Sequence, residues 1–151
     1  MKIGTYEIQV PFVTTSADTA KLIVRFADLK PGERAVDLGS GDGRVVLELA
    51  KTGLLVDGFE HKVELVTRSR ARIKAAQYGE RAKIYNTSFW DVDLSSYDII
   101  YMYGMNSILG RVENKLTKQM RHDAIFISNV FKLPRWRPKK SEGFLHLYLK
   151  Q

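Results

Sequence analysis

A glycine-rich segment follows a short apolar run and is the part of the chain best suited to hold a ligand. Residues 37–44 read D-L-G-S-G-D-G-R, with an acid ahead of glycines at alternate positions. Glycine has no Cβ and adopts positive φ readily, so the backbone can turn tightly and approach a ligand before a helix begins. A dinucleotide fingerprint would need its third glycine at the position of Arg44. The pattern therefore predicts a loop for a nucleotide-type cofactor and excludes a nicotinamide dinucleotide.

Acidic and polar residues follow the predicted strands on either side of this loop. Asp37 ends the first strand, and Glu60 ends the second at about 20 residues from the glycines, where an acid can accept both ribose hydroxyls. Such an acid could instead cap a neighbouring helix, but the glycines upstream favour the ribose. Ser88 and Phe89 follow the third strand, where an adenine ring would lie, although an aromatic residue alone is more typical of a core.

The sequence gives little support for cysteine-based or metal-based catalysis. The chain has no cysteine, which excludes disulfides, cysteine-ligated metals and a cysteine nucleophile, including cytosine C5 methylation through a cysteine adduct. His61, His122 and His146 are scattered, so we predict no metal site. The expected chemistry is therefore carried by the cofactor.

Alternating strand-like and helix-like segments predict an α/β fold that would position these residues. Strands are expected at 34–38, 54–60, 82–86, 97–103, 124–128 and 144–149, and helices at 16–29, 45–50, 62–78 and 109–120. Right-handed crossovers would make the first five strands a parallel sheet with helices on both faces. The ligand would then lie beyond the carboxyl ends of the strands, at the topological switch point.

The whole chain has the length and composition of one globular domain. It has 151 residues, 44% hydrophobic and 27% charged, so we expect a single domain over 1–151, with 1–32 as an N-terminal segment and helix. No apolar run approaches the roughly 20 residues of a membrane span, and the N-terminus lacks the apolar core of a signal peptide. We expect a cytoplasmic protein that is a monomer.

The chain is basic, with a formal net charge of +7. This charge favours polyanions or acidic surfaces as partners but indicates no specific chemistry. Basic residues gather around Trp136 in the segment 132–140. The segment is either a solvated surface loop or a patch that faces the substrate.

The glycine loop, written D-x-G-x-G-x-G, resembles motif I of the class I methyltransferases, which use S-adenosylmethionine (SAM). The resemblance extends to the small archaeal-type protein lysine methyltransferases, whose mitochondrial relatives methylate membrane-protein lysines. Residues 10–16, V-P-F-V-T-T-S, resemble the signature V-P-[YF]-V-P-T-P of that group, with Thr14 and Ser16 in place of its later prolines. Further matches are G-F-E at 58–60, S-F-W-D at 88–91, Phe131 and W-R-P at 136–138.

This resemblance implies a Rossmann-like, seven-stranded type of sheet, mostly parallel, with an antiparallel C-terminal strand. The segment between Trp136 and Phe144 is shorter than usual for the group, so the sixth strand is expected to be reduced. The implied cofactor is SAM, and the implied cofactor-binding residues are Thr15, Asp37, Gly39, Ser40, Gly41, Gly43, Glu60, Ser88 and Phe89.

The implied acceptor is a lysine amine of a protein substrate. Methyl transfer from a sulfonium is an in-line displacement that mainly requires a held and aligned acceptor. A lysine amine has a pKa of about 10.4 in water, so a partly dry channel must favour its neutral form. The residues expected to line this channel are Phe12, Tyr103, Asn106 and Trp136, with Asn129 also available.

Two other functions stay open. The positive charge favours an RNA methyltransferase acting on rRNA or tRNA. Against it, residues 101–105, Y-M-Y-G-M, replace the [DNS]-P-P-[YF] motif of adenine amino-methyltransferases, and we expect no appended RNA-binding domain. The second alternative is a SAM-binding protein with another acceptor or with no transferase activity.

Overall fold

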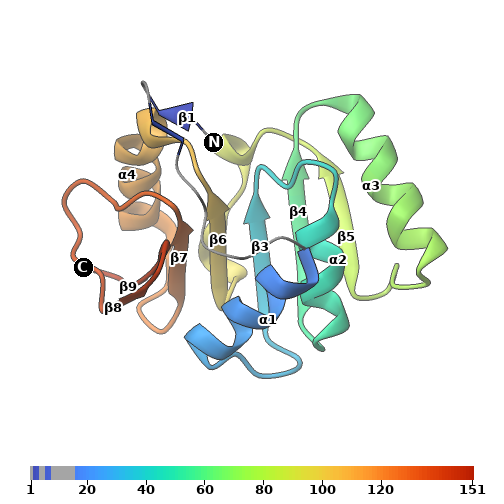
Figure 1. The fold of residues 1–151 in the computed structure, drawn as a ribbon, viewed down its shortest axis with the longest axis horizontal. Helices are drawn as coiled ribbons and strands as arrows, with labels where there is room; N and C mark the ends of the chain where they lie inside the picture. Colours follow the sequence, from blue (N-terminus) through green and yellow to red (C-terminus); the bar gives the residue numbers. More distant parts are fainter. Residues whose placement is uncertain (1, 4–5, 8–15) are drawn as a thin grey trace.

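The computed structural model describes residues 2–3, 6–7 and 16–151, and within them the main feature is a seven-stranded mixed sheet (Figure 1). A short antiparallel ribbon of β1 (Lys2–Ile3) and β2 (Tyr6–Glu7) precedes it. The sheet strands are β3 (Arg34–Leu38), β4 (Leu55–Glu60), β5 (Ala82–Asn86), β6 (Ile99–Tyr103), β7 (Ile125–Asn129), β8 (Lys140–Glu142) and β9 (Leu145–Leu149).

The strand order is β5-β4-β3-β6-β7-β9-β8. The pairs among β3 to β7 are parallel, whereas β9 runs antiparallel to both β7 and β8. The predicted mostly parallel sheet with an antiparallel C-terminal strand is therefore confirmed. The sixth strand is present in reduced form, because β8 has three residues.

Helices cover both faces of the sheet, as predicted. Helices α1 (Ser16–Ala27), α2 (Arg44–Lys51) and α3 (Val63–Ala75) pack on one face, and α4 (Leu109–Gln119) packs on the other. The 3-10 turns are η1 (Phe89–Asp91), η2 (Leu94–Ser96) and η3 (Asn106–Ile108). Helix α3 ends earlier than the predicted 62–78, since the chain adopts a positive φ of 63° at Gln77. None of the helices among the described residues has the length and apolar character needed to cross a bilayer.

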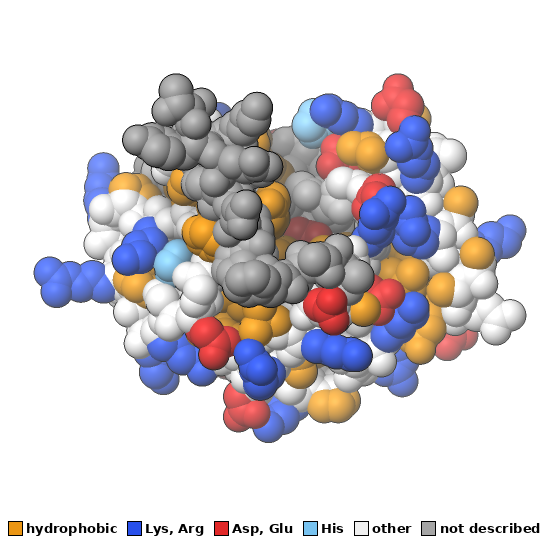
Figure 2. All heavy atoms as spheres, viewed as in Figure 1, with side chains coloured by type: hydrophobic (Ala, Val, Ile, Leu, Met, Phe, Trp, Pro, Cys, Tyr) orange, Lys and Arg blue, Asp and Glu red, His pale blue; other side chains and the backbone are white. Residues whose placement is uncertain are grey.

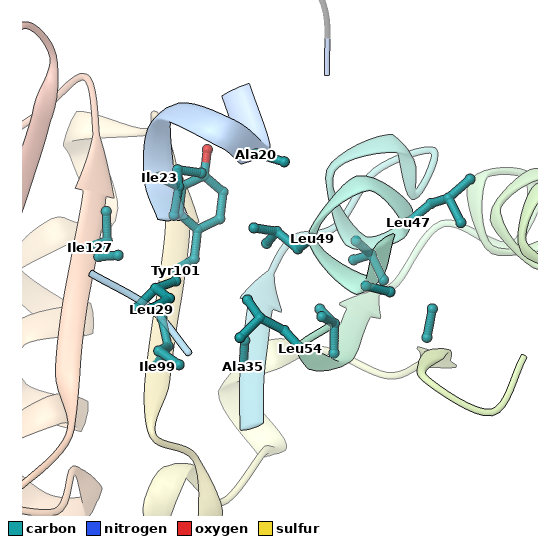
Figure 3. Packing of buried hydrophobic residues seen from close by; sticks show 14 of the residues in the cluster. Ala20, Ile23, Leu29, Ala35, Leu47, Leu49, Leu54, Ile99, Tyr101 and Ile127 are labelled. Atoms are coloured by element: carbon teal, nitrogen blue, oxygen red, sulfur yellow. The ribbon is translucent and has the colours of Figure 1, made fainter. Parts of the chain in front are cut away.

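The strands contribute side chains to two cores, one on each face. Ala35 of β3 packs in the core under α1 to α3, whereas its neighbour Val36 packs in the core under α4. Successive side chains of a strand point to opposite faces, so a strand that is buried on both faces needs a nearly continuous apolar run. Figure 3 shows the first core, with Ile23 of α1 close to Tyr101 of β6.

The topology places a crevice beside β3. The chain first extends the sheet from β3 through β4 to β5, and it then crosses to β6 on the other side of β3. The connections after β3 and β6 therefore diverge, which makes this the topological switch point where ligands bind in open α/β sheets. Asp37 of β3 lies in register with Tyr101 of β6, and Tyr103 lies in register with Asn129 of β7.

Candidate active site

The glycine loop after β3 has the backbone conformation that its sequence predicts. Gly39, Gly41 and Gly43 have φ values of 80°, 58° and 77°. A Cβ on Gly41 would meet nothing within 4 Å, so the loop leaves open space there. A Cβ on Gly43 would lie 2.7 Å from the Cβ of Ser69 in α3. The third glycine therefore permits close packing of α2 on α3, in addition to any contact with a ligand.

Helix α3 holds the loop from behind. The Ser69 hydroxyl lies 3.0 Å from the carbonyl oxygen of Gly41, and Arg72 Nε donates to the carbonyl oxygen of Asp42 at 3.3 Å. The Asp42 carboxylate also lies 2.9 Å from Arg44 Nε. These contacts arrange the loop backbone before any ligand is bound, which reduces the ordering cost of binding.

Glu60 lies at the end of β4 and supports the same loop. Its buried carboxylate accepts from the backbone N–H of Gly41 at 3.0 Å through Oε1, and from that of Lys62 at 2.9 Å through Oε2. Lys62 is the N-cap of α3, so this carboxylate contacts the backbone immediately before that helix. Each carboxylate oxygen can accept more than one hydrogen bond, so capacity remains for ligand hydroxyls.

Asp37 has a different environment from Glu60. It is 4% exposed, and it forms no hydrogen bond or ion pair within the described part of the chain. Burial, together with the negative charge of Glu60, raises the pKa of Asp37 to about 7. A buried carboxylate without a partner is unfavourable. Its presence beside a pocket therefore indicates that a cationic group of a ligand binds there.

A pocket of about 610 Å³ lies in front of Asp37 and the glycine loop. Its size is typical of sites for small molecules. The described residues that line it include Ser16, Thr19, Leu22 and Arg25 of α1, Asp37, Gly39, Ser40 and Gly41 of the loop, Tyr101, Tyr103 and Asn129 of β6 and β7, and Glu142, Gly143 and Phe144 of the β8–β9 turn. The Ser40 hydroxyl is buried and lacks a partner among the described residues.

The structure brings part of the predicted acceptor set to this pocket. Tyr103 lines it and is 50% exposed, and the buried Asn129 lines it from the neighbouring strand. Asn106 is exposed at the start of η3 and does not line the pocket. Phe12 and the predicted cofactor contact Thr15 lie outside the described residues.

The placement of Trp136 corrects the expectation from the sequence. Its side chain is 8% exposed and packs in the core with α4, on the sheet face opposite the pocket. Its backbone N–H donates to Glu113 Oε2 at 2.8 Å, and the N–H of Arg135 donates to the same oxygen. A tryptophan within a basic loop suggested a surface role, but burial of the large indole determines its position.

The cations of the segment 132–140 are all exposed at the surface: Lys132, Arg135, Arg137, Lys139 and Lys140. Figure 2 shows Lys and Arg side chains around the periphery of one face of the molecule, with no single dense patch. The solvated-loop interpretation fits these positions.

Ser88 and Phe89 follow β5 next to the glycine loop. The Ser88 hydroxyl accepts from the backbone N–H of Trp90 at 3.3 Å and so caps η1. The ring of Phe89 faces the loop, since a Cβ on Gly39 would lie 3.9 Å from Phe89 Cε2. Both residues follow β5, as the sequence predicted, and their contact with an adenine ring stays a prediction.

Sequence reasoning missed the contributions of α1 and of the β8–β9 turn to the pocket. Arg25 of α1 and Glu142 of β8 form an ion pair at 3.2 Å, and both residues line the pocket. Their separation in the chain is large and neither lies in a motif, so only tertiary packing brings them together.

The strand order and the glycine loop at the carboxyl end of β3 define the class I methyltransferase fold. The chain belongs to the family of the ANTKMT methyltransferase domain, whose sequence profile matches residues 37–140. The predicted membership of a methyltransferase family is thereby confirmed.

Relatives include enzymes of mammals and archaea. The chain is 34% identical over 134 residues to the adenine nucleotide translocase lysine N-methyltransferase of Mus musculus, in an alignment that covers 87% of this chain and 57% of the relative. It is 26% identical over 138 residues to a protein-lysine N-methyltransferase of Saccharolobus islandicus, and that alignment covers 90% of this chain and 86% of the relative. The chain thus spans little more than half the length of the mouse relative.

The fold is also found in solved structures. An RNA methyltransferase of Salinibacter ruber, in complex with S-adenosyl-L-homocysteine, superposes with a TM-score of 0.79 over 87% of this chain and 88% of that chain. The sequence identity is 24%, so the likeness supports the fold alone.

Proposed function

We propose that this protein is a SAM-dependent protein-lysine N-methyltransferase. Membership of the ANTKMT methyltransferase domain family supports the transferase class, and the relatives named as lysine N-methyltransferases support the acceptor. The observation that best supports SAM as the methyl donor is the unpaired, buried carboxylate of Asp37, which lies at the edge of a pocket in front of an open glycine loop.

The residues present fit the chemical groups of SAM. Asp37 would bind the methionine amino group, because this carboxylate has no cationic partner among the described residues and an ammonium would supply one. Glu60 would accept the ribose hydroxyls, in addition to the backbone N–H groups that it already binds. The open surface above Gly41 would let the loop backbone pass close beneath the ligand.

The acceptor must reach the pocket as a neutral amine. Bound SAM supplies the methyl group from its sulfonium, so that the C–S bond breaks as the N–C bond forms and a neutral thioether leaves. The protein therefore needs no general acid for the leaving group, and its task is to desolvate and align the amine. Among the described residues, we assign Tyr103 at the pocket edge and Asn129 beside it to binding of the acceptor amine.

The proposal is tested by the nature of the labelled product. Purified protein is incubated with methyl-labelled SAM and a heat-treated cell lysate, and the product is divided between nuclease and protease digestion. We expect the label to survive nuclease and to be released by protease. Loss of label on nuclease treatment alone would instead support the RNA methyltransferase, and SAM binding without label transfer would support a binding protein.

The matched variant for this experiment is Gly39→Arg. Its side chain would enter the space in front of the loop, so it should abolish both SAM binding and labelling. We also propose that the protein is a cytoplasmic monomer, and sizing by light scattering checks the oligomeric state.

A further inference from the structure

The pocket contains an amide side chain that binding of the donor does not use. Asn129, the last residue of β7, is 8% exposed and lines the pocket. Its Nδ2 donates to the hydroxyl of Tyr101 at 3.1 Å. Its Oδ1 has no hydrogen-bond partner within the described ranges. One strong hydrogen-bond acceptor is therefore left for a ligand in the pocket.

The backbone beside Asn129 is strained. Val130 follows it with a φ of 94°, a conformation that a β-branched residue rarely adopts because it is energetically unfavourable. Two hydrogen bonds hold this turn: Val130 N–H donates to the carbonyl oxygen of Phe144 at 2.8 Å, and Gly104 N–H donates to that of Asn129 at 2.8 Å. Backbone strain of this kind gathers at ligand sites, because it fixes a side chain in one place.

Tyr101 sets the orientation of the amide. Its ring is 2% exposed, and the residue lies in register with Asp37 on the neighbouring strand. Burial and the charge of Asp37 raise the pKa of Tyr101, so the hydroxyl keeps its proton at neutral pH. Because the hydroxyl accepts from Nδ2, the opposite end of the amide, Oδ1, is the one left for a ligand.

We propose that Asn129 Oδ1 accepts a hydrogen bond from the lysine amine that is to be methylated, and that Tyr101 is its positioning residue. This inference rests on the proposed function. The lysine first loses a proton to water, and the neutral amine then donates one N–H to Oδ1 while its lone pair forms the N–C bond. The product is a methylammonium. An uncharged amide oxygen holds the amine without the preference for ammonium that a carboxylate would impose.

The charged and titratable groups around this amide come from several elements. The groups that line the same pocket are Asp37 of β3, Tyr101 and Tyr103 of β6, Glu142 of β8, Arg25 of α1, Asp42 of the glycine loop and Arg44 of α2. A carboxylate at position 129 would add a negative charge to this set. The substitution Asn129→Asp, which has nearly the same shape, should therefore raise the pKa of the bound amine and move the pH profile of the rate to higher pH.

The test compares Asn129→Ala, Asn129→Asp and Tyr101→Phe with the wild type. The control is Asn114→Ala, which removes an exposed asparagine from α4. Methyl-lysine formation is measured by mass spectrometry at low concentrations of heat-treated lysate protein, and SAM affinity is measured by calorimetry. We expect Asn129→Ala to slow methylation by about tenfold or more, the effect of one hydrogen bond of roughly 1.4 kcal/mol, with SAM affinity unchanged. Asn129→Asp should shift the pH profile upward by about one unit.

Two results would overturn the inference. One is methylation by Asn129→Ala within about twofold of the wild type, and the other is an unshifted pH profile for Asn129→Asp. If the Asn129 variants fail to fold, Tyr101→Phe tests the inference instead, because it keeps the buried ring. Slower methylation with intact SAM affinity supports the inference, and an unchanged methylation rate refutes it. A wild type that forms no methyl-lysine refutes the proposed function itself, whereas active variants refute only the role of Asn129.

Discussion

Asp37 and Glu60 lie at the carboxyl ends of neighbouring strands of the sheet, yet only Glu60 has hydrogen-bond partners among the described residues. Glu60 accepts from the backbone N–H groups of Gly41 and Lys62, whereas Asp37 is buried beside the pocket without a partner. Glu60 therefore stabilises the glycine loop, whereas Asp37 is available for a ligand. The predictions for Asp37 follow from this difference.

SAM affinity should depend on the ionisation of Asp37. Its pKa is raised to about 7 in the free protein, and only the ionised carboxylate can pair with an ammonium. As the pH falls below about 7, affinity should fall by up to about tenfold per pH unit, and binding should release a proton. Calorimetry in buffers of different ionisation enthalpy measures both effects. An affinity that does not change between about pH 5.5 and pH 7.5 would contradict this assignment.

Asp37→Asn should stabilise the free protein while it abolishes SAM binding. The folded-state pKa lies above the ordinary value of 3.8, so the stability associated with protonated Asp37 is lost as the pH rises through about 7. The gain in melting temperature should therefore be larger at about pH 8 than at about pH 5, because the variant no longer carries the buried charge. Glu80→Gln, which changes an exposed acid, is the control. If the variant were less stable than the wild type at both pH values, Asp37 would not carry an unpaired buried charge in the folded protein.

The glycines of the loop should differ in their contribution to stability. Gly43→Ala places a methyl group 2.7 Å from Ser69 Cβ in addition to the positive φ, whereas Gly41→Ala meets only the positive φ. Urea denaturation should show a loss of about 1–3 kcal/mol more for Gly43→Ala than for Gly41→Ala. Equal losses would mean that α2 does not pack on α3 through this glycine.

Glu113→Ala should loosen the loop that carries Trp136. The Glu113 carboxylate is 3% exposed and accepts from the backbone N–H groups of Arg135 and Trp136. Its removal leaves these groups unsatisfied at a cost of about 1–3 kcal/mol, and water should reach the indole. In a Trp90→Phe background, the emission of Trp136 should shift to the red and the melting temperature should fall. Unchanged emission would argue against a core position for Trp136.

The sequence was informative wherever a local pattern determines local structure. The alternation of apolar runs with turn signals predicted the central strands within one or two residues, and the glycine spacing predicted the positive φ values of the loop. The position of the third glycine separated a SAM-type site from a dinucleotide site. These features depend on neighbours in the chain, so no knowledge of packing was needed.

The acceptor side depends on packing and was predicted less well. Tyr103 ends β6 at the switch point and lines the pocket, and its contact with an acceptor stays a prediction. Asn106 lies outside the pocket, and Trp136 lies in the opposite core. The Arg25–Glu142 ion pair joins α1 to β8 and has no signal in the sequence. The single-domain organisation over 1–151 and the N-terminal signature at 10–16 stay predictions.

The most direct test of the central claim is amino-acid analysis of the methylated product by mass spectrometry. Purified protein, SAM and heat-treated lysate are incubated, the protein fraction is hydrolysed, and Gly39→Arg serves as the parallel control. If the protein methylates lysine, the wild-type reaction should contain methyl-lysine and the Gly39→Arg reaction should contain none. Methylated nucleosides in place of methyl-lysine would contradict it.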